Sequence, residues 1–163
     1  MKLSTLCYIE REGCYLMLHR VKKKEDVNAG KWIGVGGRLE CQESPDECVI
    51  REVMEETGLT LVSPRMRGVI TFISAGWDDE IMFLYTGDAQ GDLLPDCNEG
   101  VLKWIPIEDV PSLNLWEGDR VFLKLLLESQ DFFSLKLSYD GDTLIYCALN
   151  GTDITNAVLE DLK

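Results

Sequence analysis

The sequence is poor in positive charge and in histidine. It has 16 Lys and Arg residues against 29 Asp and Glu residues, a formal net charge of −13 over 163 residues, and one histidine, His19. An acidic surface of this kind repels phosphate backbones at long range, so we exclude a general role in binding polynucleotides. Small phosphorylated ligands remain compatible with this charge if a cation or a local basic loop reverses the field.

Cysteine is too sparsely spaced for the usual metal or disulfide frameworks. The six cysteines stand at positions 7, 14, 41, 48, 97 and 147 and form no Cys-x-x-Cys pair. With one histidine in the chain, a zinc site of the usual spacing is excluded. The even count permits three disulfides, but a chain of this size builds its own core, and we expect reduced structural thiols.

Long hydrophobic runs are missing. No stretch reaches the roughly eighteen apolar residues of a membrane helix, and the apolar residues 3–9 lead directly into Glu10 and Arg11, unlike a secretory signal. We therefore expect a soluble, cytoplasmic protein with no membrane partner. The 45% of hydrophobic residues and the length fit one globular domain.

Short apolar segments alternate with turn-rich ones, which predicts a mixed sheet covered by two helices. Strands are expected at residues 3–9, 14–19, 59–62, 69–74, 81–85, 101–105, 133–137 and 144–148. The first helix is expected at residues 45–57, because Ser44, Pro45 and Glu47 form a capping box with Pro at the first helical position, and Gly58 suits a left-handed C-terminus. The second is expected at residues 117–128, where apolar residues recur with helical spacing.

The helix at residues 45–57 divides into two faces when its residues are placed at steps of about 100°. The face expected to meet the core holds Val49, Ile50, Val53, Met54 and Thr57. Glu52, Glu55 and Glu56 gather away from it, with Arg51 beside them. Like charges at this spacing repel, and Mg²⁺ is usually held by a few carboxylates and substrate phosphates. A solvated acidic face is the alternative interpretation.

The wider spacing decides between these interpretations. Gly37 is followed after five residues by Glu43 and after seven more by Arg51-Glu52-Val53-Met54-Glu55-Glu56-Thr57-Gly58-Leu59. This pattern resembles the Nudix box at every defined position. The resemblance implies an α/β protein with the Nudix fold, an α/β/α sandwich around a mixed β-sheet. It also implies hydrolysis, dependent on Mg²⁺ or Mn²⁺, of a diphosphate linked to another moiety.

The same resemblance implies roles for single residues. The expected metal ligands are the carboxylates of Glu52, Glu55, Glu56 and Glu99 and the carbonyl of Gly36, and either Glu55 or Glu56 doubles as the base. Arg51 is expected to pair with Glu43 and so support the catalytic glutamates. The basic segment at residues 20–30 would help to hold the phosphates through Arg20, Lys22, Lys23 and Lys24. A solvated loop is the alternative for this segment.

A second resemblance extends beyond the box. Residues 30–37, residues 115–119 and the closing hairpin around residues 141–144 are similar to the MutT-type oxidised purine nucleoside triphosphatases. This resemblance implies that Trp116 stacks on the purine and that Asp119 hydrogen-bonds its edge. The sequence has Ile33 and Gly118 where the animal enzymes have an Asn and the first of two adjacent aspartates. A half-buried core residue at a helix start is the alternative for Trp116.

We therefore expect one Nudix domain at residues 1–150 and an acidic tail at residues 151–163 that either extends the domain or stands outside it. The expected activity is hydrolysis of oxidised purine nucleoside triphosphates, such as 8-oxo-dGTP, to the monophosphate and pyrophosphate. The alternatives are a Nudix hydrolase for a dinucleotide, ADP-ribose or a nucleotide sugar, and a domain that senses nucleotides without turnover. The sequence leaves the oligomeric state open.

Overall fold

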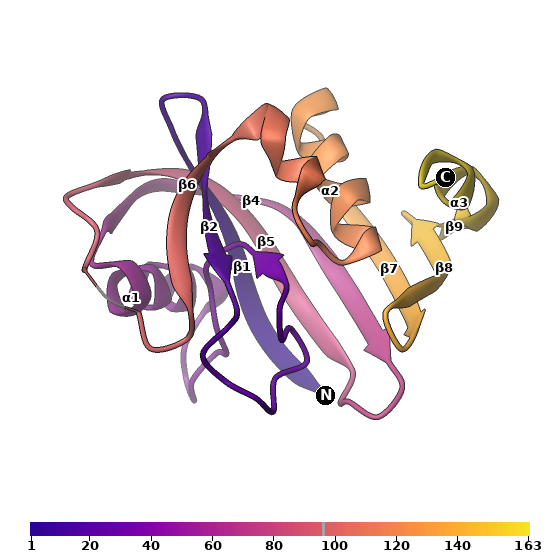
Figure 1. The fold of residues 1–163 in the computed structure, drawn as a ribbon, viewed down its shortest axis with the longest axis horizontal. Helices are drawn as coiled ribbons and strands as arrows, with labels where there is room; N and C mark the ends of the chain where they lie inside the picture. The colour runs from indigo at the N-terminus through magenta and orange to yellow at the C-terminus, as the bar shows by residue number, and fades with distance from the viewer. Residues whose placement is uncertain (96) are drawn as a thin grey trace.

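A mixed β-sheet runs through the structure, a computed structural model that describes residues 1–95 and 97–163 (Figure 1). The strands are β1 (Lys2–Arg11), β2 (Cys14–His19), β3 (Trp32–Ile33), β4 (Thr60–Ser74), β5 (Glu80–Gln90), β6 (Val101–Pro106), β7 (Phe133–Asp140), β8 (Thr143–Leu149) and β9 (Thr152–Asp153). The helices are α1 (Pro45–Thr57), α2 (Glu117–Glu128), α3 (Thr155–Asp161) and the 3-10 helix η1 (Ile107–Ser112).

The sheet has the strand order β3-β2-β1-β5-β4-β7-β8-β9, and β6 pairs with β2 beside this path. The pairs β1–β5 and β4–β7 are parallel, whereas β1–β2, β2–β6, β4–β5 and β7–β8 are antiparallel. The mixed sheet predicted from the alternation of segments is therefore confirmed.

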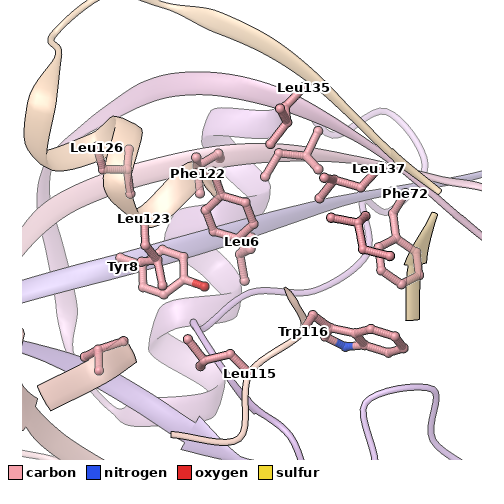
Figure 2. Close-up of a cluster of buried hydrophobic side chains, with 14 of the residues drawn as sticks. Leu6, Tyr8, Phe72, Leu115, Trp116, Phe122, Leu123, Leu126, Leu135 and Leu137 are labelled. Carbon is pink, nitrogen blue, oxygen red and sulfur yellow. The ribbon is translucent and has the colours of Figure 1, made fainter. Parts of the chain in front are cut away.

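Helices cover both faces of this sheet. Alternate residues of β1 point to opposite sides, so that Leu6 and Tyr8 join one core and Cys7 and Ile9 the other. Phe122, Leu123 and Leu126 of α2 complete the first core, as Figure 2 shows. Val49 and Val53 of α1 complete the second. The arrangement is the α/β/α sandwich that the box resemblance implied (Figure 1).

The ends of α1 lie where the sequence predicts them. Ser44 accepts a hydrogen bond from the backbone N–H of Glu47, the Glu47 side chain returns one to the N–H of Ser44, and Gly58 ends the helix at φ 77°. The predicted core-facing stripe is wrong on one side, because Ile50 and Met54 are exposed.

The buried arc of α1 instead holds Cys48, Val49, Val53 and Thr57. The helix is thus rotated on the sheet toward Cys48. At steps of about 100°, Glu52 and Glu56 then fall between Cys48 and Val49, inside the buried arc, and Glu55 falls outside it. This rotation separates three glutamates that the sequence placed together.

One continuous strand replaces the two that were predicted at residues 59–62 and 69–74. Strand β4 pairs with β5 along most of its length and changes register between Val62 and Arg65 and again between Met66 and Gly68. Ser63, at φ 50°, absorbs the first irregularity. Pro64 interrupts the apolar alternation, but a bulge accommodates it without ending the strand.

The segment at residues 151–163 contains β9, which pairs with β8, and helix α3. Val158 is buried in the same core as α2, and Ile154 and Leu162 pack against that core. Cys7, Cys14, Cys41, Cys48 and Cys147 are free thiols. Across the described residues, none of the helices is both long and apolar enough to cross a membrane.

Candidate active site

A cavity of about 440 Å³ opens between α1, the loop before it, the sheet and the start of α2. From α1 and the neighbouring loops it is lined by Gly36, Gly37, Glu52, Glu56, Glu99, Arg20 and Lys23. From the sheet and α2 it is lined by Leu6, Ile33, Phe72, Met82, Trp116 and Asp119. Residues that the sequence assigned to phosphates, metal and base thus share one cavity.

The three box glutamates are not equivalent. Glu52 and Glu56 line the cavity, whereas the side chain of Glu55 is 57% exposed. Oxygen Oε2 of Glu56 is buried and has no hydrogen-bond partner among the residues that the structure describes. A buried carboxylate oxygen without a partner is costly, so this atom is a natural position for a ligand or cation.

Burial, and after it the crowding of acidic groups, raises the pKa values of Glu56 and Glu52. Burial, followed by the charges of Glu99 and Glu52, raises the pKa of Glu56 to about 8. Burial also raises the pKa of Glu52, against the lowering effect of Arg51. Within residues 1–95 and 97–163, no three His, Cys, Asp or Glu side chains meet closely enough to form a ready-made metal site. Glu52 and Glu99 instead pair with Arg51 and Arg20.

Arg51 is the centre of one such network. Its Nε and Nη2 atoms donate to the two carboxylate oxygens of Glu43 at 2.7 and 3.0 Å, the ion pair expected from the box. Its Nη1 atom reaches Glu52 at 2.9 Å and Glu55 at 3.1 Å. Hydrogen bonds from Arg51 lower the pKa of Glu43 to about 2. Arg51 thus fixes the orientation of the Glu52 and Glu55 side chains.

The basic segment divides into two parts. Arg20 and Lys23 line the cavity, and both pair with Glu99. Arg20 also donates to Asp26 at 2.7 Å. Lys22 donates to the carbonyl of Cys97 at 2.5 Å, and neither Lys22 nor Lys24 lines the cavity. Of the four basic residues predicted to hold phosphates, the structure brings Arg20 and Lys23 to the site.

Trp116 forms a wall of the cavity. With 3% of its surface exposed, it is more deeply buried than the half-buried core residue that was the alternative interpretation. Its Nε1 atom donates to Oδ1 of Asn28 at 2.9 Å. The Nζ atom of Lys31 lies 5.1 Å from its ring centroid. Phe72 and Tyr139 contact it in edge-on geometry. The ring is therefore held firmly in one orientation.

Asp119, in the first turn of α2, also lines the cavity and is 5% exposed. Burial raises its pKa to about 8, although the positive charges of Arg120 and Lys31 act in the opposite direction. The side chain is then mostly a neutral carboxylic acid at pH 7, which can donate one hydrogen bond and accept others. Such a group suits the edge of a base.

Several cavity residues escaped prediction. Asn28 lines the cavity from the segment at residues 20–30, which resembled a solvated loop, and its contact reaches Trp116, 88 residues along the chain. Phe72 and Met82 stand on predicted strands, and alternation along those strands was the signal that could have placed them. Local patterns do not show such long-range contacts.

Comparison with known proteins agrees with this geometry. The family model of the NUDIX domain matches residues 2–126. A Bacillus subtilis protein described as an uncharacterized Nudix hydrolase is 29% identical over 140 residues, covering 83% of this chain and 85% of the relative. The mouse oxidized purine nucleoside triphosphate hydrolase is 28% identical over 133 residues, covering 80% and 85%.

Among solved structures, a MutT protein from Bacillus halodurans superposes with a TM-score of 0.82 at 26% identity and covers 92% of this chain and 98% of its own. The family match contains the glutamate helix, the loop before it and the start of α2, which together enclose the cavity. On this evidence the chain belongs to the Nudix hydrolase family.

Proposed function

We propose that this Nudix hydrolase cleaves oxidised purine nucleoside triphosphates, such as 8-oxo-dGTP, to the nucleoside monophosphate and pyrophosphate. Nudix hydrolases generally act on nucleotides and use divalent cations. The observation that carries the finer proposal is that Glu52 and Glu56 line the same cavity as Trp116 and Asp119. The relationship to the mouse enzyme, which carries this activity in its name, supports the same substrate class.

The acidic end fits Mg²⁺ or Mn²⁺. Its donors are all oxygens, as these hard cations prefer, and Oε2 of Glu56 is buried without a partner in the described part of the chain. Glu52, Glu56 and Glu99, with the carbonyl of Gly36 and with Glu55 at the exposed edge, would hold the cations. When bound, the cations supply the positive charge that neutralises the diphosphate and favours attack by water.

The protein's own side chains then have separate tasks. Arg20 and Lys23, which line the cavity, would hold phosphate oxygens once these replace Glu99 as their partner. Arg51 keeps Glu52 and Glu55 in position through its bonds to both. Either Glu55 or Glu56 accepts the proton of the attacking water. The contacts of Arg20 and Lys23 with phosphate oxygens would gain strength as negative charge builds up on the leaving pyrophosphate.

The base end supports a purine with a polar edge. Leu6, Ile33, Phe72 and Met82 give an apolar lining. Asp119, buried and mostly neutral, would donate a hydrogen bond to an acceptor on the base without bringing a charge into this lining. Trp116 supplies the flat wall against which the ring lies.

A substrate panel tests the proposal. Purified protein with Mg²⁺ receives 8-oxo-dGTP, dGTP, dATP, ADP-ribose, a dinucleoside polyphosphate and a nucleotide sugar, and monophosphate and pyrophosphate are quantified. We expect kcat/KM for 8-oxo-dGTP to exceed that for dGTP at least about tenfold, the effect of roughly one hydrogen bond to the base edge. Equal values would contradict the preference for oxidised purines.

One control variant and two further outcomes of the panel separate the alternatives. Glu56→Gln keeps the shape of the side chain and should abolish turnover while the protein stays folded. Binding of nucleotides by the unaltered protein without any turnover would favour a sensing domain instead. Turnover of ADP-ribose or a nucleotide sugar alone would indicate a different Nudix substrate class.

A further inference from the structure

The hydroxyl group of Tyr8 is buried without a hydrogen-bond partner in the described part of the chain. Tyr8 stands in the middle of β1 and has no exposed surface. Its ring packs against Tyr15 and Phe122, with centroid distances of 5.5 and 5.9 Å. A buried hydroxyl without a partner costs about 1–3 kcal/mol, and a phenylalanine would fill the same space without this cost. The hydroxyl therefore calls for a functional explanation.

The neighbourhood of this hydroxyl is the base end of the cavity. Leu6, two residues before Tyr8 on the same face of β1, lines the cavity, and the Tyr8 oxygen points to the side on which Leu6 lies (Figure 2). On α2, Asp119 precedes Phe122 and Leu123 by one helical turn and so shares their face, which packs over Tyr8.

Asp119 is also close enough to act on Tyr8 electrostatically. Burial is the first cause of the raised pKa of Tyr8, and the charge of Asp119 is the second. The other charged groups near Asp119 are Lys31 and Arg120. Tyr139 also lies near Asp119, but its hydroxyl already accepts a hydrogen bond from the N–H of Gly118 at 2.8 Å. The backbone N–H of Gly34 approaches the Tyr8 hydroxyl and lowers its pKa, but an N–H only donates, so the Tyr8 O–H still lacks an acceptor in the described part of the chain.

We propose that Tyr8 is a positioning residue, whose hydroxyl holds the Asp119 carboxyl in the orientation that selects a 6-oxopurine. This inference rests on the proposed function. With a base in the cavity, Tyr8 donates to one carboxyl oxygen, and the O–H on the other oxygen is then directed at an acceptor on the base. A 6-oxo group accepts this bond, whereas the 6-amino group of an adenine does not.

The composition of the cavity explains why a hydroxyl from β1 is needed. The MutT-type resemblance implied an Asn and a further Asp at the base, but the chain has Ile33 and Gly118 there. Gly118 cannot be replaced without conflict, because an added Cβ would meet Tyr139 and Leu137. Asp119 is thus left without a neighbouring acid to orient it, and Tyr8 supplies the polar partner from the sheet side.

Tyr8→Phe tests the inference because it removes one oxygen and keeps the ring. If Tyr8 has only a structural role, Tyr8→Phe should have equal or higher thermal stability than the unaltered protein, because the substitution removes an unsatisfied hydroxyl. Its ligand binding should then be unchanged. Our proposal predicts that the Kd for 8-oxo-dGMP rises about tenfold, while the Kd for 8-oxo-dAMP changes less than about twofold. In turnover, KM should rise for 8-oxo-dGTP with little change in kcat.

Tyr15→Phe is the matched control. Tyr15 is buried beside Tyr8, but its pKa is raised by burial and by Glu10, not by Asp119. The substitution should leave both Kd values unchanged. A double-mutant cycle adds a second test, because Tyr8→Phe should have no further effect on 8-oxo-dGMP binding once Asp119→Asn is present.

Calorimetric titration of the full chain with 8-oxo-dGMP and with 8-oxo-dAMP, without metal, separates the outcomes. Selective loss of 8-oxo-dGMP binding in Tyr8→Phe supports the proposal. If Tyr8→Phe binds both nucleotides as tightly as the unaltered protein, or loses affinity for both equally, this inference is wrong and the proposed function stands. Equal binding of 8-oxo-dGMP and 8-oxo-dAMP by the unaltered protein overturns this inference alone. Equal turnover of 8-oxo-dGTP and dGTP in the substrate panel overturns the proposed function and this inference with it.

Discussion

Gly37 and the carboxylate of Glu52 occupy adjoining space in the cavity wall, and a Cβ atom at Gly37 would overlap all three carboxylate atoms. The obstacle is the end of a flexible side chain, so Gly37→Ala should push the Glu52 carboxylate aside and leave the fold intact. We expect kcat to fall at least about tenfold, because small displacements of catalytic groups are costly. Steady-state kinetics and thermal melting measure the two effects.

Gly36→Ala provides the contrast. A Cβ atom at Gly36 would meet the backbone carbonyl of Thr5, which cannot move without disturbing β1. We expect this variant to lose stability together with activity. If Gly37→Ala melts as early as Gly36→Ala, the displacement of Glu52 is not the reason for its loss of activity.

Stability of the metal-free protein should fall as the pH rises from about 5 to 8. The folded pKa values of Glu56 and Asp119 are both raised to about 8, so in this range the folded state keeps protons that the unfolded state releases. Each group then lowers the free energy of unfolding by up to about 1.4 kcal/mol per pH unit. Urea denaturation in EDTA at several pH values measures the slope.

Glu56→Gln should reduce this slope by about half, because Asp119 still contributes, and should raise stability at pH 8. Glu55→Gln, at an exposed position, should leave the slope unchanged. Mg²⁺ should raise Tm more at pH 8 than at pH 6, because the cation competes with protons for the same carboxylates. A slope that survives Glu56→Gln unaltered would show that the Glu56 carboxyl is charged in the folded protein.

Local signals predicted the elements whose ends are encoded nearby. The capping box at Ser44 and Glu47 and the left-handed Gly58 fixed α1 to the residue. The single strand β4 was missed because a bulge at Ser63 is stabilised by pairing with β5, not by its own sequence. The rotation of α1 that buries Glu52 and Glu56 was missed for the same reason, since it depends on how the helix rests on the sheet.

The box glutamates and Arg51 could be found from the sequence because their spacing is fixed on one helix. Which basic residues face the cavity could not, because Arg20 and Lys23 are placed by their pairing with Glu99 across the fold. The Asn28–Trp116 hydrogen bond joins residues 88 apart, and nothing in the turn around Asn28 indicates its partner. Tertiary contacts therefore determine which residues line the cavity.

Asn28→Ala should weaken nucleotide binding more than turnover. The Asn28 amide oxygen holds Nε1 of Trp116, and without it the indole N–H loses its partner and the cavity wall its fixed orientation. We expect KM to rise about three- to tenfold with kcat changed less than about twofold, the pattern of a lost ground-state contact. Asn150→Ala, which removes a hydrogen bond to Ser134 outside the cavity, is the control and should leave KM unchanged. A fall in kcat with unchanged KM would show that Asn28 does not contribute to binding of the base.

Arg67 should stabilise the fold through the C-terminal end of α2. Its side chain is buried on β4, and Nη2 donates to the carbonyls of Leu126 and Ser129 at 3.1 and 2.6 Å. Arg67→Met keeps most of the volume but leaves these carbonyls without their donor, so we expect a loss of about 2–3 kcal/mol in the free energy of unfolding. Arg65→Met on the same strand removes an exposed contact with Gln130 and should cost less than about 0.5 kcal/mol.

Urea denaturation compares the free energies of unfolding of the two variants. Equal losses would mean that capping of α2 by Arg67 adds nothing to stability. Because α2 carries Asp119 at its other end, Arg67→Met should also raise KM as the temperature approaches the lowered Tm, while Arg65→Met should not.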